Sequence, residues 1–315
     1  MHELIIIGAG PAGLTAGVYA ARKQLDTLII SENVGGQTTW SSEIENYLGF
    51  MYITGVELVE RFEEHVRHFN LRQEFGRVTR LSRIEHGFRV ETEDLREFDA
   101  RAVIVASGKS PRMLNVPGER QFRGKGVTYC STCDAPLYAG SEVAVIGGGN
   151  SGLDAAVQLL KITPKVYIIE RTDSLRADEV LQTKAWAAPN VEILLQTLPM
   201  EISGDVTVSS ISVQHKSTGE RRVLPVRGVF VEIGLVPNTD FIADLVKLNK
   251  LGEIPVNCAA GTEIPGLFAA GDVTDVPEKQ IIIAAGEGAK AALQAYSYLV
   301  RLPAMAAPPV MRPTS

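Results

Sequence analysis

The sequence has few cysteines, no surplus of positive charge and no long uncharged hydrophobic run. Its 315 residues include 3 cysteines, too few for the disulfide framework of a secreted protein. Lysine and arginine number 31 against 37 acidic residues, and the net charge of −6 argues against a nucleic-acid partner. Residues 281–300 come closest to a membrane span, but Glu287 and Lys290 within them argue against it. We therefore expect a cytoplasmic protein that binds neither nucleic acid nor membrane.

The remaining composition is that of a globular protein. Hydrophobic residues make up 45% of the chain and charged residues 22%. At about 150 residues per domain, the length predicts roughly two domains. The 29 glycines indicate tight turns or close approach of the backbone to a ligand. Because residues 1–8 contain no basic stretch and no cleavage-site pattern, we expect no signal peptide.

Short apolar runs alternate with helical patterns along the chain, at residues 4–7, 27–30, 102–106, 143–146 and 165–169. This alternation predicts an α/β fold. A pattern of glycine-x-glycine-x-x-glycine follows the first of these runs and recurs after residues 143–146. Both copies stand between a predicted strand and a predicted helix, the context in which this pattern binds a dinucleotide. The sequence thus predicts two Rossmann-like dinucleotide-binding domains.

The residues of the two glycine loops are the first candidate binding residues. In each loop the first glycine makes the tight turn, the second lets a pyrophosphate approach the backbone, and the third lets the helix pack on the strand. The alternative is that each loop is an ordinary strand-to-helix turn that binds no ligand, and this would have to be true of both copies. The candidates are Gly8, Gly10, Pro11, Ala12 and Gly13 in the first loop, and Gly147, Gly149, Asn150, Ser151 and Gly152 in the second.

Two carboxylates lie where such domains often bind a ribose hydroxyl, about 20 residues after the first glycine. They are Glu32 and Glu170, and the second follows its strand more cleanly. A carboxylate at Glu170 would accept a hydrogen bond from NADH and repel the 2′-phosphate of NADPH, whereas Arg171 and Arg176 favour the phosphate. We therefore expect NADH, with NADPH as the alternative.

The domain order follows from the position of the last motif. Residues 267–272 read as a buried strand before a helix at 280–301, and we assign this piece back to the first domain. Polar, strand-like stretches at 88–93, 206–215 and 221–224 predict small antiparallel layers. We expect crossings at 108–117 and 234–240. The predicted limits are 1–112 with 241–302 for the first domain, 113–240 for the second, and 303–315 for a flexible tail.

A pair of cysteines spaced C-x-x-C stands before the second glycine loop. Cys130 and Cys133 could be half of a zinc site, but no second pair completes four ligands, so we predict no metal. A redox-active pair is the better interpretation, because a small disulfide can be reduced by a neighbouring donor, with Asp134 shuttling a proton. The third cysteine, Cys258, is expected to be buried as a small hydrophobic residue.

Together these motifs closely resemble the bacterial low-molecular-weight thioredoxin reductases, over residues 3–301. Within that family, residues 169–170, 176–182 and 286–291 look more like the flavoprotein part of alkyl hydroperoxide reductase, which uses NADH. The further motifs that carry the resemblance are Gly35-Gly36-Gln37, Glu45-Asn46-Tyr47, Ala270-Gly271-Asp272 and Lys279-Gln280-Ile281.

The resemblance implies that the first domain binds FAD and that NADH binds the second. The residues it implies for FAD are Gly8, Gly10, Gly13, Gly36, Gln37, Asn46, Asp272 and Gln280. The full cofactor-binding prediction adds Pro11, Ala12, Glu32, Gly108, Gly271 and Ile281.

The resemblance also implies an electron path from NADH through FAD to a Cys130–Cys133 disulfide. Cys133 would face the flavin, Cys130 would attack the disulfide of the partner, and Asp134 would be the acid. The partner would be a thioredoxin, a glutaredoxin-like redoxin or a protein of a peroxiredoxin system. The protein would be a homodimer whose second domain swings about the two crossings.

The sequence departs from the family pattern at three places. NADPH-dependent members carry His-Arg-Arg-x-x-x-Arg where this chain has Glu170-Arg171-Thr172 and then Arg176. The chain starts directly at the first FAD-domain strand, without the thioredoxin-like domains of the hydroperoxide reductase flavoprotein, so we expect a separate redoxin. Ala135 replaces the glycine that usually follows C-x-x-C-D, which argues against a positive φ there.

Several alternatives remain open at this point. An NADPH-dependent thioredoxin reductase or a ferredoxin-fed flavin disulfide reductase would share the fold, although the second would leave the Gly147 loop without an evident ligand. A pyridine-nucleotide oxidase or ferredoxin–NADP reductase would not need the cysteine pair. A non-catalytic flavin redox sensor would carry the cysteines without steady-state disulfide reduction.

Overall fold

The computed structural model describes residues 1–41 and 43–302. The chain forms two compact units: unit 1 contains residues 1–36, 62–108 and 238 onward, and unit 2 contains residues 37–61 and 109–237. Two of the unit limits therefore lie within a few residues of the predicted 112/113 and 240/241 boundaries. Residues 37–61 group with unit 2, although we expected them in the FAD-binding domain. The predicted tail at 303–315 lies outside the described residues.

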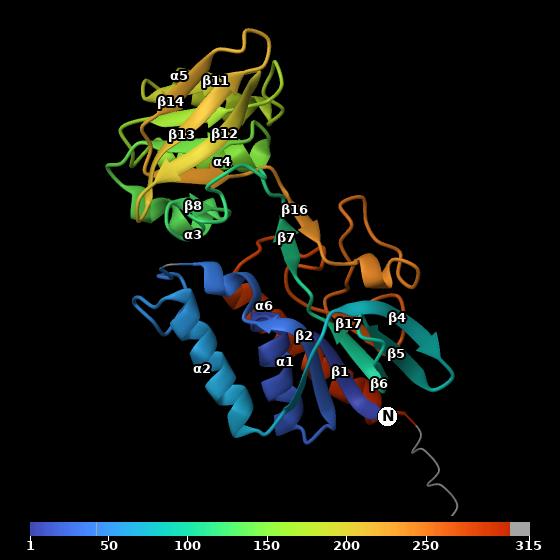
Figure 1. Ribbon diagram of the computed structural model, residues 1–315. Helices are drawn as coiled ribbons and strands as arrows, with labels where there is room; N and C mark the ends of the chain where they lie inside the picture. The colour runs from blue at the N-terminus through green and yellow to red at the C-terminus, as the bar shows by residue number, and fades with distance from the viewer. Residues whose placement is uncertain (42, 303–315) are drawn as a thin grey trace, which may run out of the picture. The chain divides into compact units, whose positions relative to one another are not determined.

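Unit 1 is built on a mixed sheet in the order β3-β2-β1-β6-β5-β4, with β17 also paired to β6 (Figure 1). Strands β1, β2, β3 and β17 run parallel to their neighbours, while β4 and β5 add an antiparallel layer. The strands of unit 1 are β1 (His2–Ala9), β2 (Thr27–Val34), β3 (Arg72–Phe75), β4 (Val78–Ile84), β5 (Gly87–Thr92), β6 (Glu97–Val105) and β17 (Leu267–Ala269).

Alternate residues of the buried strands pack on opposite faces of this sheet. Leu4 and Ile6 of β1 join one core with helices α1 and α6. Ile5 and Ile7 join another with the antiparallel layer and the segment after η3. This alternation is the side-chain period of a strand. The helical elements are α1 (Pro11–Arg22), α6 (Ile281–Leu299), η3 (Asp240–Ile242) and α2 (Gly55–His68), which spans the limit between the units.

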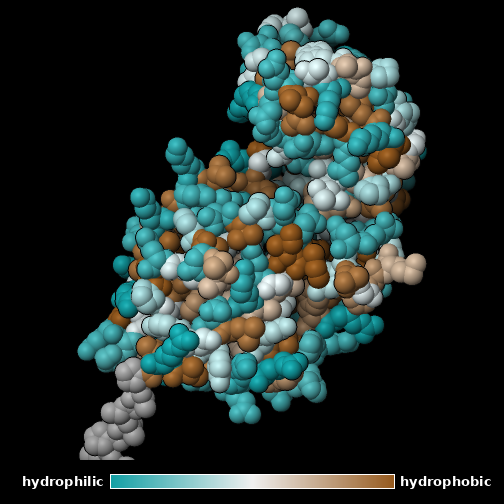
Figure 2. Space-filling view, turned by 180° about the vertical axis from the view of Figure 1, so that it is seen from behind, coloured by the Kyte–Doolittle hydropathy of each residue, from teal (hydrophilic) through white to brown (hydrophobic). Residues whose placement is uncertain are grey.

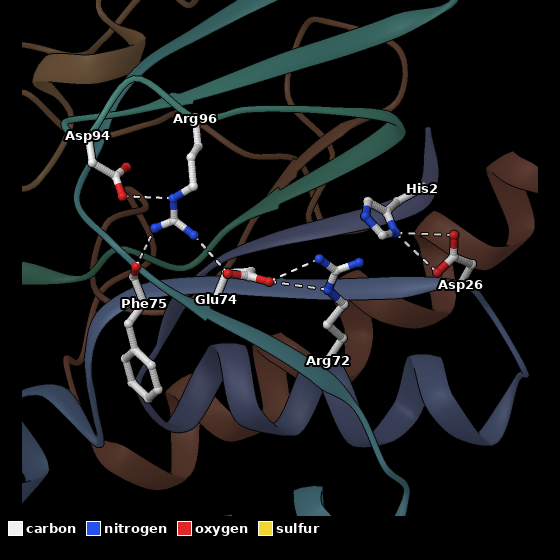
Figure 3. Close-up of polar contacts among 7 residues, drawn as sticks. All are labelled: His2, Asp26, Arg72, Glu74, Phe75, Asp94 and Arg96. Atoms are coloured by element: carbon white, nitrogen blue, oxygen red, sulfur yellow. Dashed lines mark hydrogen bonds and ion pairs between the residues drawn. The ribbon is translucent and has the colours of Figure 1, made fainter.

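A charged network joins β3 to the turn between β5 and β6 (Figure 3). The guanidinium of Arg96 donates to carboxylates of Asp94 and Glu74 and to the Phe75 carbonyl, and Arg72 donates to the other oxygen of Glu74. Exposed pairs of this kind contribute little individually. Their shared partners fix the course of the turn.

Unit 2 repeats the plan of unit 1 with a parallel sheet in the order β11-β10-β9-β15-β8. Helices α4 and α5 pack on one face of it, and the antiparallel sheet β12-β13-β14 covers the other. The two Rossmann-type domains and their antiparallel layers are thereby confirmed.

The strands of unit 2 are β8 (Val127–Thr128), β9 (Val143–Ile146), β10 (Val166–Ile169), β11 (Val191–Leu194), β12 (Thr197–Gly204), β13 (Val208–His215), β14 (Arg221–Leu224) and β15 (Gly228–Val231). The helical elements are η1 (Gly36–Trp40, beginning at the end of unit 1), α3 (Ser131–Asp134), η2 (Ala135–Tyr138), α4 (Asn150–Leu159) and α5 (Glu179–Ala187).

The two predicted crossings pair with each other. Strand β7 (Lys109–Pro111) in the first crossing runs antiparallel to β16 (Leu235–Pro237) in the second. The amide of Arg112 also donates to the carbonyl of Gly234. The chain therefore leaves and re-enters unit 1 through a two-stranded ribbon.

The surface view shows hydrophilic side chains over most of the visible face, with hydrophobic side chains in small groups (Figure 2). Within residues 1–41 and 43–302, no helix combines the length and the apolar character that a membrane crossing needs.

The first and third positions of the glycine loops are required by packing. A Cβ on Gly13 would lie 1.9 Å from the carbonyl oxygen of Gly8, and one on Gly152 would lie 1.9 Å from that of Gly147. A Cβ on Gly10, in contrast, meets nothing within 4 Å, and its φ of −77° is open to any residue. The same loop thus contains a packing glycine and a glycine that packing does not require.

We expect Gly13→Ala to lower the free energy of unfolding by roughly 1–3 kcal/mol, because the helix must move away from the strand. In protein freed of bound ligand, the matched variant Gly10→Ala should leave the free energy of unfolding unchanged or raise it by a few tenths of a kcal/mol. Denaturant unfolding of both variants provides the measurement. Equal stability of the two variants would contradict the packing role of Gly13.

Candidate active site

The first glycine loop exposes the start of helix α1. Strand β1 ends at Ala9, Gly10 is the N-cap, and α1 begins at Pro11. No side chain caps this end, and its first turn holds no acidic residue. The leading amides of a helix have no partner within the helix and attract anions. The loop therefore offers backbone amides, with open space at Gly10, to an anionic ligand.

Several other predicted FAD residues lie around this loop in unit 1. Gly36 has a φ of +54°, and its ideal Cβ would lie 3.9 Å from the Cα of Gly10. Gly271 has a φ of +78°, and its ideal Cβ would lie 3.0 Å from the Cβ of Ala12. Asp272 follows it directly, and Gln280 and Ile281 form the N-cap and the first residue of α6. The structure thus brings together residues from both ends of the chain.

Glu287 is a part of this arrangement that sequence reasoning missed. Its side chain on α6 is 7% exposed, and its carboxylate accepts the Gly271 amide at 2.8 Å. The neighbouring Gly288 packs so closely that a Cβ would lie 2.0 Å from the Ala12 carbonyl oxygen. In the sequence, Glu287 argues against a membrane span and belongs to the 286–291 stretch that carries the resemblance, but no local pattern marks the Gly271 amide as its partner.

The remaining residues predicted for the first cofactor are divided between the two units. Glu32 is exposed and pairs with Arg77 at 3.6 Å. Gln37 belongs to unit 2, where its side-chain amide donates to the Lys109 carbonyl at 2.6 Å. Asn46, also in unit 2, is exposed. Gly108 has a φ of +68° at the end of the unit 1 segment. Their cofactor contacts stay predictions.

The second glycine loop has the same construction in unit 2. Gly147 has a φ of +123°, and a Cβ there would lie 2.5 Å from the Glu232 carbonyl oxygen. Gly149 is the N-cap of α4 and has open space beside it, and no side chain caps the helix. Asn150 accepts the Asp178 amide at 2.7 Å, while Ser151 is exposed. This loop also offers backbone amides to an anion.

Glu170 closes β10 directly beside this loop. Its side chain is buried, and one carboxylate oxygen accepts the Gly148 amide at 2.6 Å. The other oxygen accepts the amide and the hydroxyl of Thr172 at 2.9 and 2.7 Å. Burial opposes ionisation, but these hydrogen bonds and the guanidinium of Arg176 at 3.8 Å outweigh it and hold the pKa of Glu170 below its ordinary value. The carboxylate is therefore charged and fixed against the loop.

Arg171 and Arg176 lie close to Glu170 in the chain but reach outward. The Arg176 side chain is 58% exposed, and its backbone amide donates to the Gly148 carbonyl. Arg171 is exposed. Both cations thus border the loop that Glu170 supports.

Cys130 and Cys133 form a disulfide with a Cα–Cα distance of 5.3 Å. Cys130 is the N-cap of α3, and its sulfur accepts the Cys133 amide at 3.3 Å. A hydrogen bond of this kind favours the thiolate once the disulfide is reduced. Both cysteines are half-buried. Among the described residues, no three or more His, Cys, Asp or Glu side chains gather as a metal site would require.

Asp134 stands at the end of the same turn. One of its carboxylate oxygens is bonded to the Thr128 hydroxyl, while the other is buried and has no hydrogen-bond partner in the described part of the chain. Burial raises the pKa of Asp134 to about 6, helped by the nearby Glu43 and opposed by the Thr128 hydrogen bond. The group therefore holds a proton closer to neutral pH than an ordinary aspartate does. Ala135, which follows it, has a φ of −54°, so no positive φ is needed there, as we predicted.

The expectation for Cys258 was wrong. Cys258 is exposed in a turn instead of being buried in a strand. The side chain of Asn257 accepts the amides of Ala259 and Gly261 and forms this turn, which directs the intervening cysteine outward. Asparagine before small residues was the missed turn signal.

The chain matches the pyridine nucleotide-disulphide oxidoreductase family model over residues 2–289. It is 42% identical over 301 residues to an NADH dehydrogenase of Bacillus subtilis and equally to a subunit of alkyl hydroperoxide reductase from Staphylococcus epidermidis. Each alignment covers 95% of this chain and 59% of the relative. The chain thus spans little more than half the length of these curated relatives.

A solved structure is similar to this chain over almost its whole length. The thioredoxin reductase of Streptococcus pyogenes is 36% identical and superposes with a TM-score of 0.92, covering 96% of this chain and 99% of that one. The chain therefore belongs to the pyridine nucleotide-disulphide oxidoreductase family. Its cofactors are FAD and a pyridine nucleotide.

The two glycine loops fit cofactors of this kind. FAD and NAD(P)H each carry a pyrophosphate, and each unit contains a helix whose uncapped start could receive one. Both helices lack an acid in the first turn, which would repel the phosphates. The open space at Gly10 and Gly149 leaves room for close approach. Which side chains contact each cofactor stays a prediction.

Proposed function

We propose that this protein uses NADH to reduce the disulfide of a small thioredoxin- or glutaredoxin-like protein, or of a protein of a peroxiredoxin system, through FAD and the Cys130–Cys133 pair. The observation that supports this most strongly is the disulfide itself, which is followed by Asp134, a half-buried acid with its pKa raised to about 6, in the unit that carries the second glycine loop. Homodimer formation and a cytoplasmic location belong to the same proposal.

The cysteine turn supplies what thiol–disulfide exchange requires. Bound FAD would pass the electron pair of NADH to the disulfide. Breaking the S–S bond yields two sulfurs that together take up two electrons and two protons. The Cys133 amide then stabilises negative charge on Cys130, which favours the thiolate, the form that attacks a disulfide.

Transfer to the partner proceeds by two exchanges. The Cys130 thiolate attacks one sulfur of the partner disulfide, forming a mixed disulfide and releasing a partner thiolate. Asp134, with its pKa raised to about 6, can give that thiolate its proton. Cys133 next loses its proton and attacks Cys130 as a thiolate, which restores the intramolecular disulfide and releases the second partner sulfur, to which that proton passes. The partner is thereby reduced to a dithiol.

The position of Glu170 supports NADH as the electron donor. Its carboxylate is charged and lies against the Gly148 amide, at the strand end where a ribose hydroxyl is bound in related folds. A 2′-phosphate there would meet this negative charge. Arg176 offsets it only in part, because its guanidinium lies at 3.8 Å and is largely exposed.

We expect Cys130→Ser and Cys133→Ser each to lower the rate of NADH-dependent redoxin reduction by more than about 100-fold, because neither variant can form the disulfide. Both should still oxidise NADH with an artificial one-electron acceptor, since the cysteines lie after FAD in the path. The assay follows NADH oxidation with a panel of thioredoxins and glutaredoxin-like proteins.

Cys258→Ser is the matched control, because this exposed thiol lies in unit 1 and should leave turnover unchanged. Near-normal redoxin reduction by either variant of the pair would overturn the proposed path. A wild-type protein that binds FAD and oxidises NADH but reduces no redoxin would favour an oxidase or a redox sensor.

We expect the wild type to prefer NADH over NADPH and Glu170→Gln to weaken that preference. The amide oxygen of glutamine can still accept from Gly148, so this bond to the loop is kept while the charge and the bond from the Thr172 amide are lost. A change of roughly 1–3 kcal/mol, or about 5- to 150-fold in the ratio of kcat/KM values, is typical of one polar contact.

The kcat/KM values of both nucleotides decide this prediction, with Arg171→Ala and Arg176→Ala measured beside them. A wild type that favours NADPH, together with an unchanged ratio in Glu170→Gln, would show that the arginines select the nucleotide.

A further inference from the structure

The loop between β17 and α6 joins two groups of residues that we predict to contact FAD. Gly271 and Asp272 stand at its start, and Gln280 and Ile281 stand at its end, where α6 begins. The residue before Gln280 is Lys279, which belongs to one of the motifs that carry the family resemblance. None of the roles described above uses this lysine.

The ammonium of Lys279 is directed back onto its own loop. Its Nζ donates to the carbonyl oxygen of Thr274 at 2.7 Å and also to that of Val276. Glu278, directly before the lysine, has a φ of +62°, a left-handed conformation that is uncommon for a residue other than glycine. The turn at Glu278 brings the ammonium back to the two carbonyls and leaves Gln280 at the N-cap of α6.

A buried acid supplies the counter-charge of this ammonium. The Oε1 atom of Glu253 lies 3.7 Å from the Nζ of Lys279. The other carboxylate oxygen of Glu253 accepts the side-chain amide of Asn249 at 2.7 Å. The side-chain oxygen of Asn249 accepts the backbone amide of Glu253 at 3.0 Å. The position of the acid is therefore fixed by the turn in which it lies.

The segment after Glu253 is bonded to the start of the same loop. The amide of Ile254 donates to the carbonyl of Val273 at 3.0 Å, and the Ile254 carbonyl accepts the amide of Asp275 at 3.1 Å. The carboxylate of Asp275 accepts the amide of Val256 at 3.0 Å. These bonds hold the start of the loop, while the ion pair holds its end. All of these residues belong to unit 1.

An ion pair with so little exposure depends on both partners. The side chain of Lys279 is 19% exposed and that of Glu253 is 8% exposed. Removing one charge leaves the other uncompensated in a poorly solvated place, whereas replacing both by neutral residues costs less. Loss of Glu253 would therefore favour movement of the ammonium toward water and away from the two carbonyls. The end of the loop that carries Gln280 would then lose its fixed position.

We propose that Lys279 and Glu253 are a pair of positioning residues for FAD, which fix the loop that carries Asp272 and Gln280. The inference rests on the prediction that Asp272 and Gln280 contact FAD, and it is independent of redoxin reduction. The alternative is a direct contact between the ammonium and an FAD phosphate. An acid beside a phosphate-binding lysine repels the phosphate, whereas an acid that positions the loop aids binding. The two roles thus make opposite predictions for removal of the acid.

The experiment measures the dissociation constant of FAD by separating free from bound FAD at a series of dilutions of the purified holoprotein, with circular dichroism to check that each variant is folded. We expect Lys279→Met and Glu253→Gln each to raise this constant by about 10-fold or more, the lower end of what loss of a supporting contact costs at metal sites. Lys279→Arg, which keeps the charge and can donate to carbonyls, should restore most of the affinity. Glu253→Asp draws the charge away from the ammonium and is a milder variant with an effect of the same sign.

The double variant tests the coupling between the two residues. Because it leaves no uncompensated charge, it should raise the dissociation constant no more than Lys279→Met alone does. Glu263→Gln is the control for charge, since it removes an exposed acid of unit 1. Arg89→Met is the control for an ion pair, since it breaks the pair with Asp99 between β5 and β6. Both controls should leave the dissociation constant unchanged, even where the free energy of unfolding falls.

An unchanged or lower dissociation constant in Glu253→Gln and Glu253→Asp would overturn the inference and favour direct contact of the lysine with a phosphate. Effects of the two single variants that simply multiply in the double variant would overturn it as well. Because the measurement needs neither redoxin nor NADH, failure of the proposed redoxin reduction would leave this result unaffected.

Discussion

The close approach of a helix to the strand before it sets the geometry of both units. The third glycine of each loop lies so near the carbonyl of the first that a Cβ there would be 1.9 Å from its oxygen. This approach leaves the start of α1 and of α4 uncapped, with open space at the middle glycine. The backbone amides freed there are what suit each unit to a pyrophosphate.

The first amides of the redox turn also have no partner within their own helix. Helix α3 is short, and its first amides are taken by the sulfur of Cys130 and the carboxylate of Glu232. Two half-buried acids contact or follow the turn, and desolvation raises the pKa of each, to about 6 for Asp134 and about 7 for Glu232. The chemistry we propose uses the proton of Asp134, which desolvation keeps available near neutral pH.

Local patterns predicted the parts of the fold that depend on near neighbours. The two glycine loops, the strand at 143–146 and the crossings could be read from spacing and composition, because each is fixed within a few residues. Glu170 was predicted at the end of its strand, but its bonds to Gly148 and Thr172 depend on tertiary packing. Glu232 lies about 100 residues from the cysteine turn, and no local pattern marks it. The misassigned Cys258 shows the reverse case, in which a local asparagine turn was mistaken for a strand.

Anaerobic titration with NADH, combined with counting of thiols, tests the central claim most directly. If FAD and the Cys130–Cys133 disulfide are successive electron acceptors, each chain should consume two equivalents of NADH and gain two trappable thiols at these cysteines. Consumption of one equivalent with no gain of thiols would show that the cysteines lie outside the electron path and would contradict the account.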